Sequence, residues 1–439
     1  MQRRRIINML LILLGTSVLV ALMGVAAYRI VWPQRERLAQ AVVGRLRPQP
    51  SATPDPTMLT PDAPDTSSAG AHLTPTPEPT EERIALPLVG RPPTATPSPE
   101  ATRTPTPTPR PTRTPTPTPT PTLPWPDALT EPGPSKLGLH VQWNNSPEIM
   151  EYVRRMRPAV IKVVSDFGFL AEVKQVSPNT VIVARMEEDS QPMEGDPIQA
   201  ARHFVATHLD EYLRHPAVDY WEGYNEPGVH GNMEWYAAFE AERVRVMAQH
   251  GLRTAIGGFS TGVPEWEDLV AFLPAIRVAK DHGGILTLHE YDAPTMDRSV
   301  GMGLPDRPGQ PHRGVLTLRY RWWYEELLKP QGLAIPLVIS EAGVDGLVSN
   351  RPGPADGRGW LDFCDYWAEQ GLGRDGIRIY LNQLAWYDAE LQKDDYVLGC
   401  AVFTAGPMNH HWVSYDITPI LRHIATYIIV PGSRSAAQP

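Results

Sequence analysis

The sequence predicts an α/β chain whose globular part, from Lys136 onwards, folds as a (β/α)8 barrel. Short apolar segments rich in branched residues alternate with helical patterns, and this alternation repeats eight times over about 300 residues. Short, continuously apolar segments are typical of parallel strands that are buried on both faces. Eight strand–helix repeats in this length favour a closed barrel. A doubly wound open sheet is the alternative, because it shows the same alternation.

The eight predicted strands are separated by patterns with helical spacing. The clearest of these runs from Asn232, the expected N-cap, to His250 and ends at Gly251. The predicted strands are Leu137–Trp143, Val160–Val164, Thr180–Met186, Val218–Tyr224, Thr254–Phe259, Ile285–Tyr291, Leu337–Ser340 and Val397–Thr404.

The N-terminus carries a long apolar run. Arg3-Arg4-Arg5 precedes the stretch Met9–Ala27, whose length suits a bilayer crossing of roughly 20 residues. We therefore expect a signal-anchor transmembrane helix within residues 1–31. It would place a single-pass protein in the cell membrane with its globular part outside the cytoplasm. Cleavage near Val25-Ala26-Ala27, which would give a secreted protein, is the alternative.

Residues 32–135 have a different composition. More than half of the 48 prolines lie between Pro48 and Pro134, and Thr-Pro pairs repeat through 104–109 and 114–122. Alternating prolines cannot pair as strands and favour an extended polyproline II conformation. The segment is therefore predicted to be a disordered Pro/Thr-rich linker. The predicted barrel then covers residues 136–432, followed by a tail, 433–439.

The charge is distributed unevenly along the chain. The net charge is −9, yet residues 1–50 carry +7 and residues 51–135 carry −4, so the remainder carries −12. An acidic globular part argues against nucleic acid as a partner. The two cysteines, Cys364 and Cys400, form no C-x-x-C pair, so neither a disulfide framework nor a zinc ribbon is expected. Two buried thiols or a single disulfide stay open, as does the oligomeric state.

Two glutamates follow predicted strands at informative places. Asn225-Glu226-Pro227 comes directly after the fourth strand, and Glu341 comes directly after the seventh. The carboxyl ends of all strands meet at one face of a barrel, where catalytic side chains gather. Paired carboxylates are what the cleavage of a glycosidic bond requires: one protonates the leaving oxygen while the other attacks or activates water.

These segments resemble clan A of the glycoside hydrolases, the retaining, cellulase- and xylosidase-like barrels. Trp221–Pro227 is similar to the strand-four motif of that clan, and Ile339–Gly343 to its strand-seven motif. Ile256–Phe259 resembles a Gly-Gly segment of strand five, and His289–Tyr291 resembles a strand-six segment with an active-site His and Tyr. The resemblance covers about residues 136–430, in short motifs only.

The resemblance implies roles for particular residues. Glu226 would be the general acid/base and Glu341 the nucleophile of a double displacement on an extracellular glycan, with no cofactor. Asn225 would bind the sugar 2-hydroxyl, Tyr291 would orient Glu341, and His289 would supply the active-site imidazole.

Three further residues are candidates for sugar binding. His140 and Arg185 lie at the ends of the first and third strands, although His140 could equally be structural. Trp412 follows the eighth strand, where the clan often places an aromatic platform, but it is displaced in sequence and Phe403 lies nearer.

Several competing interpretations remain. By strand parity Glu222 lies deeper than Glu226 and is expected to be structural, and Glu290 is expected to face the helices.

Gly258–Gly262 fits G-x-S-x-G, which allows a serine esterase using Ser260 with Asp292 and either His312 or His410. A catalytically silent glycan-binding barrel is the alternative from another class. No metal is expected, since neighbouring histidines such as His410 and His411 rarely share one ion and H-E-x-x-H is absent.

Overall fold

The computed structural model describes residues 123–429. The predicted signal-anchor, most of the predicted linker and the tail therefore lie outside the described residues. No helix of the described part is long and apolar enough to cross a membrane.

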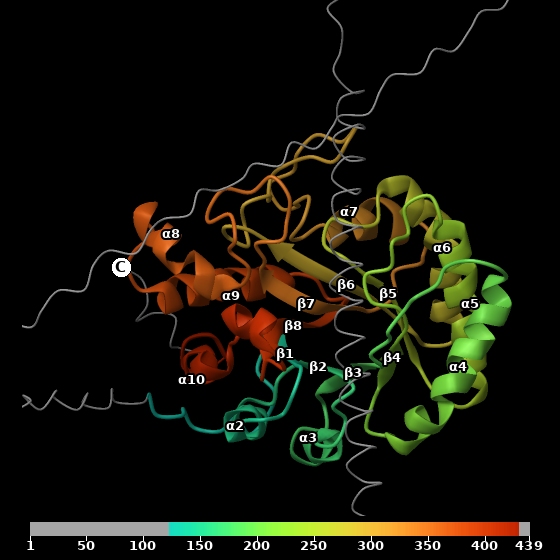
Figure 1. The fold of residues 1–439 in the computed structure, drawn as a ribbon, viewed down its shortest axis with the longest axis horizontal. Coiled ribbons are helices and arrows are strands. Elements are labelled where there is room, and N and C mark those ends of the chain that lie inside the picture. Colours follow the sequence, from blue (N-terminus) through green and yellow to red (C-terminus); the bar gives the residue numbers. More distant parts are fainter. Residues whose placement is uncertain (1–122, 430–439) are drawn as a thin grey trace, which may run out of the picture. The chain divides into compact units, whose positions relative to one another are not determined.

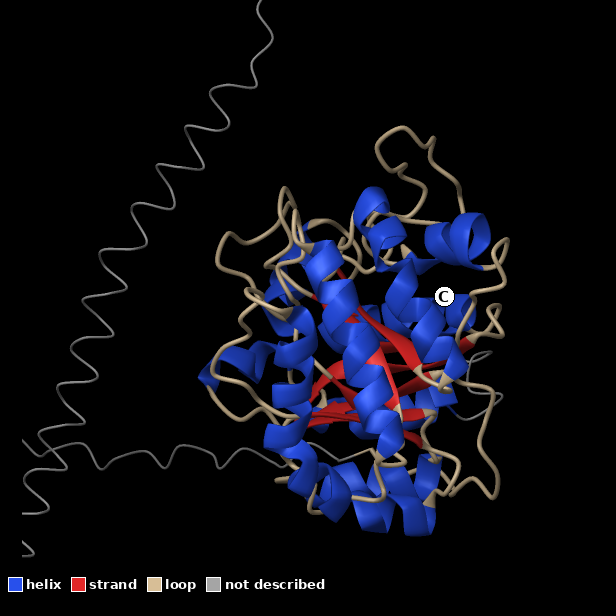
Figure 2. Ribbon diagram, turned by 90° about the vertical axis from the view of Figure 1, so that its right-hand side faces the viewer, coloured by secondary structure: helices blue, strands red, loops and turns tan. Residues whose placement is uncertain are grey.

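Eight parallel strands form one closed barrel in the order β1 to β8, with β8 paired to β1. Helices surround this sheet, as Figure 2 shows. The closed order confirms the predicted barrel over the open sheet. The strands are β1 Leu137–Val141, β2 Val160–Val164, β3 Val181–Arg185, β4 Tyr220–Glu222, β5 Thr254–Phe259, β6 Ile285–Asp292, β7 Leu337–Val344 and β8 Val397–Ala405.

The helices follow the strands along the chain (Figure 1). The α-helices are α2 Pro147–Met156, α3 Leu170–Val176, α4 Pro197–Arg214, α5 Met233–Gln249, α6 Trp266–Asp281, α7 Tyr320–Trp323, α8 Cys364–Glu369, α9 Gly376–Leu391 and α10 Leu421–Ile424. Shorter 3-10 or π-helical turns are η1 Tyr324–Leu328, η2 Trp360–Phe363, η3 His410–Tyr415, η4 Thr418–Ile420 and η5 Ala425–Ile429.

Local sequence explains where several helices begin. The side chains of Ser146, Asp196 and Asp375 accept hydrogen bonds from the first turns of α2, α4 and α9, as N-cap residues do. Asn232 precedes α5 as expected but does not cap it, because its side chain donates to the carbonyl of Met193.

Only β2 and β5 have the predicted bounds, and the differences in β4 and β7 concern the site. β4 ends at Glu222, so Glu226 lies four residues beyond it. There the Glu226 amide donates to the carbonyl of Gly258, 2.8 Å away on β5. β7 continues past Glu341 to Val344, because it stays paired with β6 as far as Asp292.

The interior of the barrel changes character along the strands. A small apolar cluster fills it near the start of most strands, formed by Val160, Val183, Ala255, Ile285, Val338 and Ala401. On β2 and β4 a fully buried ion pair, Lys162 with Glu222, also lies in the interior. The helices pack on the outside of the barrel through one large apolar cluster. The barrel interior is therefore apolar near the start of the strands and becomes polar toward their carboxyl ends.

Residues 123–135 contain no helix or strand but contact helices of the barrel. The indole of Trp125 lies 6.4 Å, ring centroid to ring centroid, from Tyr152 on α2. The guanidinium of Arg155 donates to the carbonyl of Pro126, and the Leu129 amide donates to the carbonyl of Arg155. This end of the predicted linker thus packs on α2.

Candidate active site

A cavity of about 250 Å³ opens at the carboxyl ends of the strands. Seven of the eight predicted site residues line it: His140, Arg185, Asn225, Glu226, Tyr291, Glu341 and Trp412. The eighth, His289, lies beside it and contacts Glu226. The structure therefore brings together residues that the sequence separates by as much as 272 positions.

Glu226 lies at the edge of this cavity in an unusual backbone conformation. Its φ angle is 46°, a left-handed conformation that costs a non-glycine residue about 1–2 kcal/mol. Such strain persists where the surroundings enforce it, and it gathers at functional sites. Its side chain is 38% exposed, and Oε1 lies 2.8 Å from Nδ1 of the buried His289.

Glu341 is held by three neighbours from two strands, β1 and β6. Its Oε2 accepts a hydrogen bond of 2.8 Å from the hydroxyl of Tyr291 and lies 3.5 Å from Nδ1 of His289. Its Oε1 lies 3.5 Å from Nε2 of His140. Burial alone would raise the pKa of Glu341, but His289, His140 and Lys162 outweigh it and hold this pKa well below its usual range. Glu341 is therefore an anion in a largely enclosed site.

The two carboxylates lie close together. Nδ1 of His289 is 2.8 Å from Oε1 of Glu226 and 3.5 Å from Oε2 of Glu341. These two oxygens can be no farther apart than the sum of those distances, 6.3 Å. Retaining glycosidases hold their carboxyl groups about 5–5.5 Å apart, and inverting ones about 6.5–9.5 Å.

The two histidines have different electrostatic surroundings. Burial would lower the pKa of His289, but Glu341 and Glu226 raise it above its ordinary value. His140 is dominated by burial, which lowers its pKa despite Glu341. The hydroxyl of Thr404 fixes the His140 ring, 3.1 Å from Nδ1. His289 is thus the imidazole that the carboxylates favour in its cationic form.

The buried pair of Lys162 and Glu222 lies below these groups. Burial opposes the charge of Glu222, but Lys162, followed by His289, lowers the pKa of Glu222 to about 2. Sequence reasoning assigned Glu222 a structural place, and its contact with Lys162 agrees. Lys162 was not predicted from the sequence. A lysine in the middle of the apolar strand Val160–Val164 is nevertheless a visible signal of a buried charge.

The remaining predicted residues present polar or aromatic groups to the cavity. Oδ1 of Asn225 and Nε of Arg185 are buried without a hydrogen-bond partner, so each can serve a bound hydroxyl. The ring of Phe403 lies 4.8 Å from that of His140 and 5.3 Å from that of Trp412. Both aromatic side chains that the sequence proposed near β8 therefore line the cavity.

Other lining residues were not singled out from the sequence. One of them is Asp345, whose Oδ1 accepts a hydrogen bond of 2.7 Å from Tyr415, another lining residue. Asp345 follows β7 by one residue, so its strand-end position was the available signal. The others are Gln142, Val164, Glu187, Leu347, Met408 and Asn409.

Glu290 faces the helices, as strand parity predicted. Its carboxylate accepts from the amide of Leu318 and from the hydroxyl of Tyr387, each at 2.7 Å. Burial, partly opposed by these hydrogen bonds, raises its pKa to about 7.

The esterase alternative lacks its hydrogen bonds. Asp292 accepts from the amides of Ala293 and Ser299, and His312 faces Glu325 at 3.3 Å. In the described part of the chain no hydrogen bond joins Ser260 to a histidine. No group of three or more His, Cys, Asp or Glu side chains within residues 123–429 is arranged to hold a metal ion.

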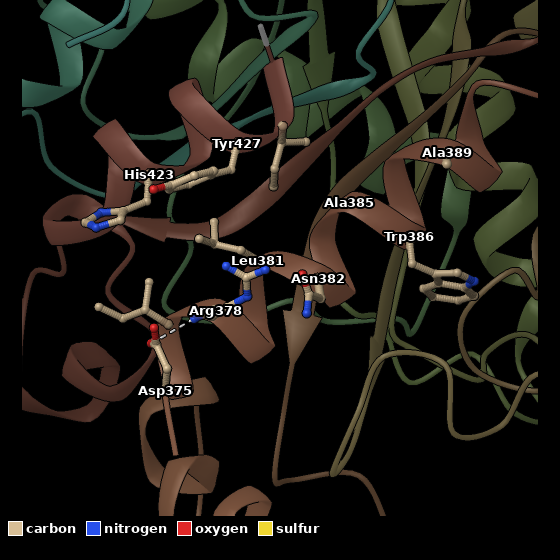
Figure 3. A pocket seen from close by; sticks show the side chains of 11 residues that line it. Asp375, Arg378, Leu381, Asn382, Ala385, Trp386, Ala389, His423 and Tyr427 are labelled. Carbon is tan, nitrogen blue, oxygen red and sulfur yellow. Dashed lines mark hydrogen bonds between the residues drawn. The ribbon is translucent and has the colours of Figure 1, made fainter. Parts of the chain in front are cut away.

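A second cavity, of about 470 Å³, lies outside the barrel between α9 and the helical turns of 421–429 (Figure 3). Its only carboxylate, among the described residues that line it, is Asp375, which caps α9 through the Arg378 amide. Apolar side chains such as Leu381 and Ile428 make up much of the lining. This cavity is larger than the first, but it lacks a facing pair of carboxylates.

Comparisons of the whole chain place it beside solved glycoside hydrolase structures. It is similar to an endo-beta-1,3-glucanase from Pseudomonas viridiflava, with 15% identity and a TM-score of 0.35 over 65% of this chain and 96% of that one. A family 39 glycoside hydrolase from Bacteroides cellulosilyticus WH2 gives 13% identity and a TM-score of 0.42 over 68% and 65%. A family 51 alpha-L-arabinofuranosidase from Bifidobacterium longum shows 14% identity and a TM-score of 0.35. The match covers 64% of this chain and 69% of that one.

No family model matches the sequence, and no curated protein matches it either. These likenesses establish no reaction for this chain. The barrel is established by its closed strand order.

Proposed function

We propose that this protein is a retaining O-glycoside hydrolase that acts on a glycan outside the cytoplasm. One observation carries the proposal: the carboxylate oxygens of Glu226 and Glu341 face the same nitrogen of His289, at 2.8 and 3.5 Å, at the rim of one cavity. Their separation of at most 6.3 Å is short of the range that inverting enzymes use.

In the first step, the ionised Glu341 attacks the anomeric carbon and the glycosidic C–O bond breaks. Glu226 gives its proton to the departing oxygen, so the leaving group is a neutral alcohol and a glycosyl ester remains on Glu341. The low pKa of Glu341 keeps the nucleophile charged. Glu226 is the more exposed of the two side chains, as exchange of its proton with solvent requires.

In the second step, water attacks the anomeric carbon and gives its proton to Glu226, while the ester bond to Glu341 breaks. The product keeps its anomeric configuration and both carboxyl groups return to their starting states. Asn225 and Arg185 offer unpaired polar atoms to substrate hydroxyls. The apolar stretch Met9–Ala27 would anchor the protein in the membrane.

The experiment is hydrolysis of a panel of 4-nitrophenyl glycosides by full-length protein, with proton NMR to establish the configuration of the first product. We expect activity, retention, and losses of at least about 100-fold in Glu226→Gln and Glu341→Gln. Glu187→Gln is the matched control, because Glu187 lines the same cavity without contacting either carboxylate.

Three outcomes would replace this proposal. An inverted product would end the double displacement. Sugar binding without turnover would indicate a silent glycan-binding barrel, and hydrolysis of aryl esters that is lost in Ser260→Ala would indicate an esterase.

A further inference from the structure

The cavity between the carboxylates continues into a second hollow. Gln142, Val164 and Met408 line both of them, and the second adds Trp143, Ser165 and Asp166. The concave surface is therefore continuous from Glu341 to the loop that follows β1.

This second hollow exposes large apolar side chains. Trp143 is 55% exposed and Met408 is 54% exposed, whereas most large apolar side chains of the described part are buried. An indole face beside a thioether gives a flat, adaptable apolar surface. The C–H face of a sugar ring is a chemical match for such a surface, and the surrounding Gln142 and Asp166 suit its hydroxyls.

The hollow is built from loops that are tied to one another. The side chain of Gln142 accepts a hydrogen bond of 3.2 Å from the Met408 amide, which joins the ends of β1 and β8. The Asn144 amide donates to Asp166 at 2.7 Å, which joins the loops after β1 and β2. Trp143 is therefore presented by a fixed frame, and binding there costs little ordering entropy.

The position of Trp143 around the barrel indicates which part of a substrate would bind in the second hollow. Trp143, Met408 and Asp166 follow β1, β8 and β2, three consecutive strands of the closed order. Glu226 follows β4, which lies opposite β8 in a ring of eight. A general acid stands on the side of the departing group, so Trp143 lies on the side of the sugar that becomes bonded to Glu341.

We infer that Trp143 and Met408 form a binding subsite for a second sugar ring on the non-departing side of the cleaved bond. The protein would then prefer substrates with at least two sugar units before that bond. This inference rests on the proposed function and deepens it.

The test compares matched 4-nitrophenyl glycosides that share a leaving group and differ by one sugar: β-glucoside against β-cellobioside and β-laminaribioside, and β-xyloside against β-xylobioside. We expect kcat/KM to be roughly tenfold or more higher for the disaccharide of the pair that is hydrolysed. Trp143→Ala should remove this advantage and leave the monosaccharide rate within about twofold. Trp143→Phe should restore part of it.

Trp386→Ala is the control, because Trp386 lines the separate cavity outside the barrel. Equal rates on both members of the hydrolysed pair, or an advantage that survives Trp143→Ala, would overturn the subsite while the glycosidase stands. An effect of Trp143→Ala on the monosaccharide alone would place the indole at the first sugar and overturn it too. Absence of hydrolysis from every substrate would overturn the proposed function and the subsite with it.

Discussion

Nδ1 of His289 carries one hydrogen at most, yet two carboxylates face it. The shorter contact, 2.8 Å, goes to Glu226, and the contact to Glu341 is 3.5 Å. Glu341 therefore depends on the hydroxyl of Tyr291, at 2.8 Å, for its close hydrogen bond. The Tyr291 hydroxyl therefore orients Glu341, and the positive charge of nearby groups such as His289 and Lys162 keeps it ionised.

We predict that Tyr291→Phe lowers kcat/KM by roughly 10- to 100-fold, since a hydrogen bond to a charged group is worth about 1.5–3 kcal/mol. The thermal midpoint should change little. Steady-state kinetics on the best aryl glycoside gives the answer. Tyr415→Phe serves as the comparison, because Tyr415 lines the same cavity but donates to Asp345. Equal losses in the two variants would contradict the orienting role.

Lys162 and Glu222 are both fully buried, so removing one leaves an uncompensated charge. We predict that Lys162→Met destabilises the protein by about 3–5 kcal/mol. The double variant Lys162→Met, Glu222→Leu should recover most of this, because neither charge of the pair is then left without its partner. Urea unfolding of the three proteins forms the cycle. A double variant as unstable as the single one would show that packing, not charge, holds the pair.

The sequence identifies single site residues where a motif with catalytic residue types directly follows a predicted strand. Glu226 and Glu341 could be found in this way, and strand parity correctly separated Glu290 from Tyr291. Lys162 could not be placed, because its importance comes from Glu222 on another strand. The bridge through His289 Nδ1 could not be predicted either, since it depends on how three strands lie around the barrel.

At the scale of elements, Glu290 joins β6 to the beginning of α7. Its carboxylate accepts from the amides of Leu318 and Tyr320, at 2.7 and 3.3 Å. Burial raises its pKa to about 7 from an ordinary value near 4.5. A raised pKa means that the folded state holds the proton more tightly, so this contribution is complete below pH 4.5 and is lost as the pH rises toward 7.

We predict that stability falls between about pH 4.5 and 7 by on the order of 3 kcal/mol more in the wild type than in Glu290→Gln. Thermal unfolding at several pH values in this window measures the difference. Glu267→Gln, at an exposed position of α6, should follow the wild type. Parallel curves for wild type and Glu290→Gln would rule out this account of Glu290.

Gly406 links the end of β8 to the loop after β1. Its φ angle is 61°, and a Cβ at this position would lie 1.9 Å from the carbonyl oxygen of Trp143. We predict that Gly406→Ala destabilises the protein by more than the roughly 1–2 kcal/mol of left-handed strain and disturbs the Trp143 subsite. Thermal unfolding together with the disaccharide preference reports both effects.

Gly283→Ala isolates the backbone strain, because Gly283 has a φ of 68° but no atom within 4 Å of an added Cβ. If the two alanine variants unfold at the same temperature, the close contact with the Trp143 carbonyl does not lower the stability of the Gly406→Ala variant.

The element pattern was largely readable from the sequence because parallel strands are apolar and short. β2 and β5 begin and end where expected. β4 and β7 differ, because the length of a strand depends on its partners: β4 stops at Glu222 while β7 follows β6 past Glu341. Where a strand ends depends on the strands paired with it, and the local sequence pattern does not contain this information.

At the scale of the whole described part, Arg422 joins its two ends. It donates to Glu148 on α2 through two bonds of 2.8 Å, and to the Leu123 carbonyl at 3.0 Å. Its guanidinium also lies 5.3 Å from the ring centre of Trp125. Trp125 and Leu129 pack on the apolar core.

We predict that a fragment starting at residue 123 is more stable than one starting at residue 136. The shorter fragment loses the apolar contacts of Trp125, which should lower its thermal midpoint by about 2–6 °C. Trp125→Ala in the longer fragment should account for much of the loss. Identical midpoints would favour a boundary at the predicted position, between residues 135 and 136.

The closure of the sheet also bears on how this protein meets other proteins. Each of the eight strands has a partner on both sides, so the described part offers no unpaired strand edge. Such edges are the usual template for strand addition and for edge-to-edge aggregation. Contacts made by this part of the chain must therefore use loops and helix faces. Crowding many copies at a surface would not join their sheets into a continuous one.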